Sequence, residues 1–592
     1  MTAADGLSWH RQITASVKVN GRALEETWLD AMVALNVQLG YRLPGRCVLR
    51  FADPEHKLVA NAPAFDSKVT VDIAGKQVFA GVVTGVSLER REHATSDVIV
   101  VADDGAHALA SRGTVTAFSK MTAADIITKL VADAGLRGRI AATTTQFECV
   151  LQTDTHLALV DELTAREGLD WWFEGTTLHV AKPEATTTVE LAREQLLAVS
   201  VRASGLQRTE VDVTGWSIER KDTVAASLPS AKPAAPAEST MAARAYAASR
   251  PGKGKALVSA LGPFTDAEAK VLSQAIAGQV GARSIVVRGT MHVDPRIALG
   301  TEVKLIDAGP ANGTYPVTQV EHSWSTSGFR TRFTAGERRP TMLVDTLGAH
   351  AGAPPRRGGL DHGGLVIGVV TNIKDPNKQG RVKLKLPAIS TDMETDWARV
   401  AMAGAGPDRG VFFLPEVNDE VLVGFEGSDL RRPVVLGGLY NGKDKPKTYD
   451  ASGTPTTGGR RITSKKGYIV ELADGTAPDQ QHVLLQLDDV KAKIRLGKDK
   501  VEVESPSGKP ISLKSGDSSI EIGPDGSITI KGTKVTIEAK TELKLSGANA
   551  SIAAQAKAEL SGQAAVSVKS GGMGEVAATG PLTVKGAMVA IN

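Results

Sequence analysis

The sequence is poor in cysteine, in aromatic residues and in net charge. Its 592 residues include two cysteines, Cys47 and Cys149, which excludes a disulfide framework and a cysteine-based metal site. Aromatic residues make up 4% of the chain while 60 residues are glycine, a balance that favours an extended β architecture over a thick globular core. The formal net charge of +3 is small for this length, so charge gives no argument for a nucleic acid or a membrane surface as partner.

Long apolar runs are also missing. No stretch approaches the roughly 20 apolar residues of a membrane-spanning helix. The segment Met1–His10 lacks the basic and apolar regions of a secretory signal peptide. We therefore expect the protein to be made and assembled in the cytoplasm, and to leave it only with the help of another machine.

Catalytic signatures are absent as well. The eleven histidines form no H-E-x-x-H pair, and neither a G-x-S-x-G elbow nor a phosphate-binding G-x-x-x-x-G-K-[ST] loop occurs. Residues Asp375–Gly380 (DPNKQG) resemble the start of a calcium loop but lack the later glutamate that would complete it, so they are predicted to form a turn. The sequence predicts no enzyme, no catalytic residue, no metal site and no cofactor.

The most regular stretch runs from Val501 to Asn592 and repeats every eight residues. In the five successive octads that begin at residue 549, the fourth position is apolar, and an alanine or glycine precedes each octad. If about a quarter of residues were large and apolar, five in a row would arise by chance about once in a thousand. The residues assigned to the core of this repeat are Ile520, Ile528, Ile552, Leu560, Val568, Val576 and Val584.

A period of eight suits neither a heptad coiled coil nor a known short-repeat solenoid. Apolar residues alternate locally, as in Ile520/Ile522, so each octad is predicted to be one short strand and a corner made by a small residue. One strand per corner cannot bury its apolar side or pair its edge within a single chain. The pattern favours a needle of three intertwined chains, a trimeric β-helix; a single-chain β-solenoid is the alternative.

The rest of the chain is predicted to be mainly β with some α. Thr122 and Asp125 form a capping signal at the start of a helix, and Gly168 ends a second helix. The pair Trp171/Trp172 follows on a strand, so one indole should face the core and the other the opposite side.

Alternating strand patterns define the domains. Five expected strands after residue 365 suit an OB-fold barrel, and its aromatic residues are not interleaved with lysine or arginine clusters, so no nucleic acid is expected there. The predicted order is a region 1–347 with two related β units (about 10–105 and 200–345) and an α/β part (about 115–190), a linker 348–364, an OB-fold barrel 365–445 and an octad-repeat spike 463–592.

Several phrases, in this order, resemble the VgrG-type spike of contractile injection systems, a group that includes type VI secretion, contractile phage tails and phage-like extracellular particles. The phrases are TAADIITKLVADAGL (122–136), HLALVDELTAREGLDWWFEGTTLHV (156–180), GTYPVTQVEHSWSTSGFRTRFTAG (313–336), GRVKLKLP (380–387) and LPEVNDEVLVGFEGSDLRRPVVLGGLYN (414–441). The resemblance covers nearly the whole chain.

The resemblance implies a tail-hub region, an OB barrel and a needle in a homotrimeric particle component. It implies an inner tube ring protein and other baseplate proteins as partners, transient contact with a target membrane, and a PAAR-type tip protein and effectors at the needle's end. The residues expected to bind the tip protein are Met588, Val589, Ala590, Ile591 and Asn592.

Two other functions remain open from the residues alone. A trimeric adhesive or tail-fibre stalk would share the octads but not the β units and barrel before them. A secreted β-helical carbohydrate-active enzyme would need a signal peptide and paired carboxylates on one face, and neither is evident.

Overall fold

The computed structural model describes residues 15–90, 96–203, 210–229, 255–258, 265–282, 285–336, 364–390, 393–426, 429–446, 460–487 and 492–591. It divides into two compact units, Met1–Lys445 and Pro446–Asn592. The predicted linker 348–364 lies outside the described residues except for Gly364. Within the described part of the chain, no helix is both long enough and apolar enough to cross a membrane.

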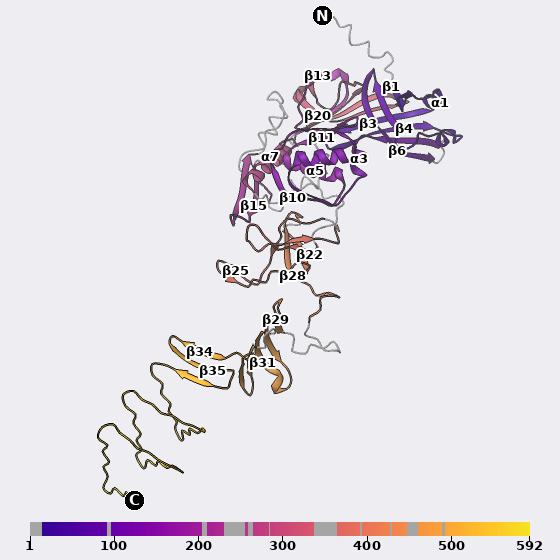
Figure 1. The fold of residues 1–592 in the computed structure, drawn as a ribbon. Helices are drawn as coiled ribbons and strands as arrows, with labels where there is room; N and C mark the ends of the chain where they lie inside the picture. The colour runs from indigo at the N-terminus through magenta and orange to yellow at the C-terminus, as the bar shows by residue number, and fades with distance from the viewer. Residues whose placement is uncertain are drawn as a thin grey trace. The chain divides into compact units, whose positions relative to one another are not determined.

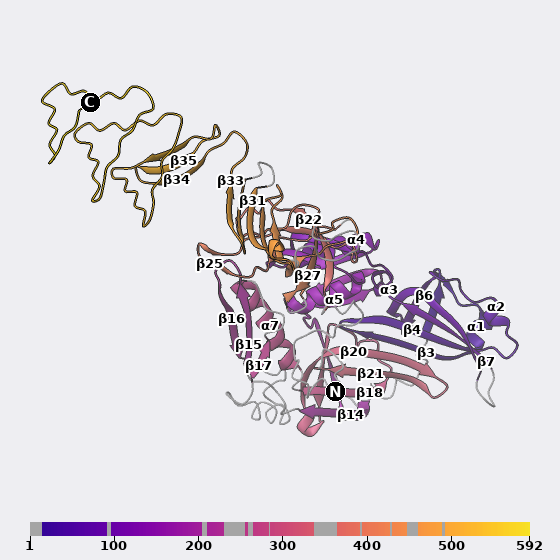
Figure 2. The same ribbon diagram turned by 90° about the horizontal axis from the view of Figure 1, so that it is seen from below.

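A sheet of thirteen strands forms the body of the first unit (Figures 1 and 2). Its two halves meet edge to edge where β20 pairs antiparallel with β3, placing Val320 opposite Leu39. Each half buries its own apolar cluster, one around Phe51 and the other around Tyr315. The two predicted β units thus lie in one continuous sheet, and the second half already starts at β13, before residue 200.

The first half of this sheet contains β1 (Ala15–Val19), β2 (Arg22–Ala23), β3 (Met32–Gly40), β4 (Leu43–Ala52), β5 (Lys68–Ile73), β6 (Lys76–Arg90) and β7 (Ser96–Asp103), with the short helices α1 (Glu26–Asp30) and α2 (Lys57–Ala60). The second half contains β13 (Thr187–Ala192), β14 (Leu196–Ala203), β18 (Ile285–His292), β19 (Thr301–Ile306), β20 (Gly313–Ser325) and β21 (Gly328–Ala335).

An α/β part lies between these halves in sequence. The capping box predicted at Thr122 is confirmed: its Oγ1 accepts a hydrogen bond from the Asp125 backbone N–H at 3.2 Å, and Asp125 Oδ2 accepts one from the Thr122 N–H at 3.1 Å. The elements are α3 (Ala106–Ala110), β8 (Thr116–Thr122), α4 (Ala123–Asp133), β9 (Arg137–Ile140), β10 (Gln146–Gln152), α5 (His156–Glu167), β11 (Asp170–Glu174) and β12 (Thr177–Ala181).

Helix α5 ends at Gly168, as predicted, because the chain turns there with a left-handed φ of +68°. A Cβ at Gly168 would lie 3.0 Å from Cα of Ala275 in α7, so glycine also permits the two helices to approach closely. Helix α7 (Asp266–Ala282) packs on a small sheet of β15 (Glu210–Ser217), β16 (Asp222–Pro229) and β17 (Lys255–Val258).

The five strands expected after residue 365 are present and form one sheet in the order β23-β22-β27-β28-β24. They are β22 (Val366–Asn372), β23 (Lys383–Lys385), β24 (Arg399–Val400), β27 (Glu420–Phe425) and β28 (Pro433–Gly438), with a small hairpin of β25 (Ala405–Gly406) and β26 (Arg409–Gly410). Their alternate residues, Val421 and Val423 among them, are buried in the barrel core.

The second unit begins with two antiparallel sheets. A five-stranded meander is formed by β29 (Arg460–Thr463), β30 (Ile469–Asp474), β31 (Gln481–Leu487), β32 (Ala492–Gly497) and β33 (Val501–Glu504). A three-stranded sheet follows, with β34 (Ile511–Ser515), β35 (Ser518–Ile522) and β36 (Ile528–Lys531). Residues 532–591, all of them described, form no strand in the single chain, so the intertwined β-helix stays a prediction.

Candidate functional site: the barrel joint and the exposed repeat

The barrel does not complete its core alone. Cys149 and Leu151 of β10 lie in the same buried cluster as Val382, Leu384 and Val421 of the barrel. Burial raises the pKa of the Cys149 thiol to about 11, so the side chain packs as a neutral apolar group and is not a nucleophile. The α/β part and the barrel therefore share one core across the predicted linker.

A buried ion cluster reinforces this joint. Arg431, between β27 and β28, donates from Nη1 to Glu268 Oε1 of α7 at 2.9 Å and from Nη2 to Asp429 Oδ2 at 2.8 Å. Its guanidinium also lies 5.8 Å from the ring centroid of Phe147 on β10. Burial alone would raise the pKa of Asp429, but the positive charge of Arg431 outweighs burial and lowers it to about 2. Arg431 thus links the barrel to α7 through an ion pair with Glu268 and to β10 through its contact with Phe147.

The segment Asp375–Gly380 forms the turn that the sequence predicts. The Asp375 carboxylate accepts backbone hydrogen bonds from Asn377 at 3.0 Å and Gln379 at 2.8 Å, and it pairs with Arg381 Nη2 at 2.8 Å. The Arg381 side chain holds the pKa of Asp375 well below its usual range. With these partners the carboxylate shapes the loop.

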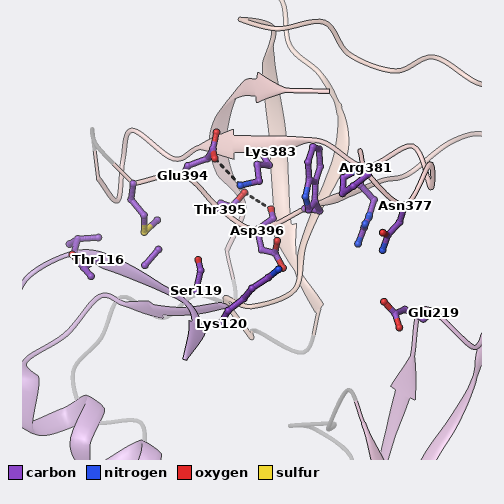
Figure 3. A pocket seen from close by; sticks show the side chains of 15 residues that line it. Thr116, Ser119, Lys120, Glu219, Asn377, Arg381, Lys383, Glu394, Thr395 and Asp396 are labelled. Carbon is purple, nitrogen blue, oxygen red and sulfur yellow. Dashed lines mark hydrogen bonds and ion pairs between the residues drawn. The ribbon is translucent and has the colours of Figure 1, made fainter. Parts of the chain in front are cut away.

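A polar cleft of about 800 Å³ opens between the barrel, β8 and the end of β15 (Figure 3). Lys383 of the barrel and Ser119 and Lys120 of β8 line it, with Glu219 at one end. Lys383 is already paired, because its Nζ lies 2.9 Å from Glu394 Oε2. Among the described residues, no group of three or more His, Cys, Asp and Glu side chains is arranged to hold a metal ion.

The two adjacent tryptophans take the orientations that the sequence predicts. Trp171 is buried, and its Nε1 donates to Asp161 Oδ1 at 2.9 Å, the same carboxylate oxygen that pairs with Arg42 Nη2 at 2.6 Å. Trp172 is partly exposed and stacks on His179 with ring centroids 5.2 Å apart. Both indoles therefore have packing roles within the first unit.

The predicted needle-core residues are exposed in the single chain. The structure pairs Ile520 with Ile530 across β35 and β36, and Ile528 with Ile522. The other five lie in the segment that forms no strand. The exposed fractions are 42% for Ile520, 67% for Ile528, 90% for Ile552, 76% for Leu560, 84% for Val568, 81% for Val576 and 67% for Val584.

The predicted tip-binding segment is exposed too. Met588 is 88% exposed and Ile591 is 91% exposed, with Val589 between them at 49%. Ala590 is exposed as well, and Asn592 lies outside the described residues. The structure therefore places an accessible apolar segment at these positions, and its role as a receptor stays a prediction.

Sequence reasoning missed the joint and the first sheet of the second unit. The joint is formed by Phe147, Glu268 and Arg431. These residues belong to three segments without a common motif, so no local sequence signal identifies the joint. The meander 460–504 did carry a weaker signal, because Ile469–Asp474 and Gln481–Leu487 are short segments rich in Val, Ile and Leu, although their apolar and polar residues do not alternate strictly.

Two family models match this chain. Residues 42–328 match the phage tail baseplate hub (GPD) family, and residues 366–440 match the type VI secretion system/phage-baseplate injector OB domain. The first match spans β4 to β20, which includes part of both halves of the large sheet and the α/β part, and the second spans the barrel.

Curated relatives align over short segments. The type VI secretion system spike protein VgrG1a of Pseudomonas aeruginosa is 30% identical over 95 residues, which is 15% of this chain and 15% of the relative. The spike protein VgrG2a of the same organism is 34% identical over 71 residues, 11% of this chain and 8% of the relative. The aligned segments thus span well under two thirds of these relatives.

The comparison with solved structures aligns more of the chain. A component of the type VI secretion system from E. coli, described as structurally similar to the T4 bacteriophage tail proteins gp27 and gp5, covers 72% of this chain and 99% of its own, with 14% identity and a TM-score of 0.43. A chain of the Francisella PdpA-VgrG complex covers 88% of this chain and 80% of its own, with 8% identity and a TM-score of 0.47.

Proposed function

Because the chain belongs to the VgrG-type spike and hub proteins of contractile injection systems, we propose that it is the non-enzymatic central spike and hub of such a particle. Three copies form the functional unit. The trimer connects a sixfold inner tube and other baseplate proteins to a needle that contacts a target membrane transiently. It assembles in the cytoplasm and acts as part of the particle.

The exposure of the octad residues carries this proposal. Ile552, Leu560, Val568 and Val576 recur at one position of the repeat, and each is at least 76% exposed in the single chain. An apolar row of this kind is unfavourable in water and marks a surface that another molecule covers. Identical chains offer identical rows at matching heights, so a threefold bundle can bury all of them at once.

The two halves of the thirteen-stranded sheet support the proposed position of the hub between the tube and the needle. Each half has its own buried core, and they are joined by the β20–β3 ladder. Three chains would present six such halves in a ring, which matches the sixfold symmetry of a tube to the threefold symmetry of a needle.

The mass of the purified chain tests the proposal. Light scattering or native mass measurement at micromolar concentration is expected to give three times the mass of one 62.0 kDa chain. A stable, folded monomer with an intact octad region would contradict it.

We further propose that Met588–Asn592 is the receptor of a tip protein of the PAAR type, which can carry an effector. The segment is apolar and exposed, and an exposed extended segment is a template for another β element. Deleting residues 589–592 is expected to abolish co-purification of the tip protein while the chain stays trimeric. Equal recovery of tip protein by truncated and intact trimers would exclude this segment as the receptor.

A further inference from the structure

The small sheet β11-β12-β9 of the α/β part has one edge that the described chain leaves open. Its other edge, along β11, is covered, because the Trp171 carbonyl oxygen accepts a hydrogen bond from the Arg42 N–H at 2.7 Å. Strand β9 pairs in parallel with β12 on one side, and within the described residues no second strand pairs with it. The outer edge of β9 can therefore take another strand.

The backbone hydrogen bonds of β9 show which groups lie at this edge. The Arg137 N–H donates to the Thr176 carbonyl oxygen at 3.4 Å. The Ala141 N–H donates to the Val180 carbonyl oxygen at 2.8 Å. Successive residues of a strand direct their backbone groups to opposite edges, so the N–H and C=O of Gly138 point away from β12. These are the groups that an edge strand offers to an added strand.

Two arginines of β9 share one face of the sheet. Leu178 and Val180 of β12 are buried on the core face. His179 lies between them on the opposite face, and Arg139 is its neighbour in register. Arg137 lies on the same face as Arg139, and both are exposed. Among the described residues, neither arginine has an acidic partner within ion-pair distance, so the open edge carries two positive charges at alternate positions.

The rest of this outer face is occupied by contacts within the sheet. Trp172 stacks on His179, and His179 Nε2 lies 3.3 Å from Glu174 Oε2. These side chains belong to β11 and β12, and the arginines of β9 lie at the margin beside the open edge. A partner at this place therefore meets two guanidinium groups and the backbone of an edge strand.

The chemistry of this edge identifies its partner. A strand added to β9 would lie about 4.8 Å away and would repeat its side chains on one face roughly every 7 Å, the same spacing as that of Arg137 and Arg139. Carboxylates at alternate positions of the added strand would accept charge-assisted hydrogen bonds from the two guanidinium groups. No segment outside the described residues carries two acidic residues at alternate positions, so those segments do not supply the strand.

We propose that the free edge of β9 binds an extended acidic segment of another protein, which joins the sheet as its fourth strand. The backbone of that segment pairs with Gly138, and two of its carboxylates, separated by one residue, pair with Arg137 and Arg139. The site lies wholly in the first unit, so it depends neither on the proposed trimer nor on the needle.

Fluorescence anisotropy with the full-length chain tests the site. The probe is a labelled peptide in which glutamate alternates with threonine. The control peptide has the same composition, but its glutamates occur in adjacent pairs separated by two threonines, so that no two stand at alternate positions. We expect the alternating peptide to bind at least about tenfold more tightly.

Charge reversal measures the contribution of the arginines. Arg139→Glu is expected to weaken binding of the alternating peptide at least about tenfold, because like charges then face each other. Lys129→Glu is the matched control, since it makes the same change of charge at an exposed position of α4 and should leave the affinity unchanged.

Gly138→Pro separates strand addition from simple attraction between charges. Proline removes the N–H that faces the open edge and keeps both arginines, and an edge strand tolerates proline where the N–H points away from the sheet. A Cβ at Gly138 would lie 3.0 Å from Cδ1 of Ile140, the flexible end of a side chain that can shift. We expect the variant to keep the thermal unfolding of the wild type and to bind the alternating peptide at least about tenfold more weakly.

The outcomes separate this proposal from the proposed function. Equal affinity for the two peptides, or equal binding by Arg139→Glu and Lys129→Glu, overturns it. Binding that Arg139→Glu weakens and a folded Gly138→Pro does not is attraction of charge alone, and it overturns strand addition. If Gly138→Pro lowers the mass of the chain's own assembly, a second copy occupies the edge and the proposal also fails. The mass of the wild-type chain, which tests the trimer, is measured independently of all these results.

Discussion

A valine of the barrel and a valine of the octads differ in their exposure to solvent. Val421 is fully buried against its own chain, whereas Val568 is 84% exposed. Both lie in segments that the sequence predicts to be strands, Val421 in a short apolar run and Val568 in an alternating one. The difference lies in what surrounds the strand. In the barrel, five strands and part of β10 enclose one shared core. The octads from residue 532 onward form no strand in the single chain and enclose no core.

This difference separates two kinds of stability. The hub and barrel gain their hydrophobic stabilisation within one chain, so their unfolding should be independent of concentration. The second unit exposes its apolar residues in the single chain. In the proposed trimer other chains would cover them, so its order should depend on protein concentration. In the proposed trimer, the symmetry-related chains would supply the missing surface.

The largest expected effect is that of Val568→Asp. At a threefold axis this change places three carboxylates at one level without partners, at a cost of several kcal/mol each or a large shift of their pKa. We expect native mass measurement to show loss of trimer while the thermal unfolding of the hub is unchanged. Ser567→Asp, which the alternation places on the outer side, is the matched control. If both variants assemble alike, the assignment of inner and outer positions is wrong.

A smaller effect is expected within the first unit from Arg431→Met. Removing the guanidinium takes from the buried carboxylates of Glu268 and Asp429 their nearest cation and leaves Arg166 Nη1 3.9 Å from Glu268 Oε1, which we expect to cost about 3 kcal/mol in free energy of unfolding. The control is Arg220→Met, because Arg220 pairs with Asp266 of the same helix α7 but both side chains are more than half exposed. That pair should contribute less than about 1 kcal/mol.

Denaturant unfolding of the full chain measures both changes. Adding Glu268→Gln to Arg431→Met should restore part of the loss, since one buried negative charge is then removed. If Arg431→Met and Arg220→Met destabilise the hub equally, the joint is not held by the buried cluster.

Local features of the first unit were predictable because their causes are adjacent in sequence. The capping box of Thr122 and Asp125 depends on residues three apart, and the end of α5 depends on Gly168 alone. The inward and outward positions of Trp171 and Trp172 follow from the period of a strand. The family resemblance extended this local information to the order of hub and barrel.

The surfaces between segments were not predictable in the same way. That Cys149 packs in the barrel core depends on barrel strands that are distant from it in sequence. Arg431 and Arg432 are adjacent arginines, and the sequence does not say that the first is buried against Glu268 of α7. That Val470, Leu485 and Ile494 stand opposite one another in the meander follows only from the registers of its strands.

The smallest predicted effect tests the most local of these causes, in the region that folds within one chain. Thr122→Ala removes the side chain that accepts from the Asp125 N–H, which should cost the hub about 1 kcal/mol in free energy of unfolding. The pKa of Asp125 lies below its ordinary value because the Thr122 side chain and backbone donate to its carboxylate, so the variant should raise that pKa.

Thr128→Ala is the control for this change. Thr128 lies on the exposed side of the same helix, and its Oγ1 donates to the Ala124 carbonyl oxygen, so alanine there should be neutral or slightly stabilising. Denaturant unfolding gives the free energies, and NMR titration of Asp125 gives the pKa. Neither variant should alter the concentration at which half of the proposed trimer dissociates, because the capping box lies in the first unit, which buries its own core. A shift of that concentration by Thr122→Ala would show that the two units are energetically coupled, and the contrast between them would have to be given up.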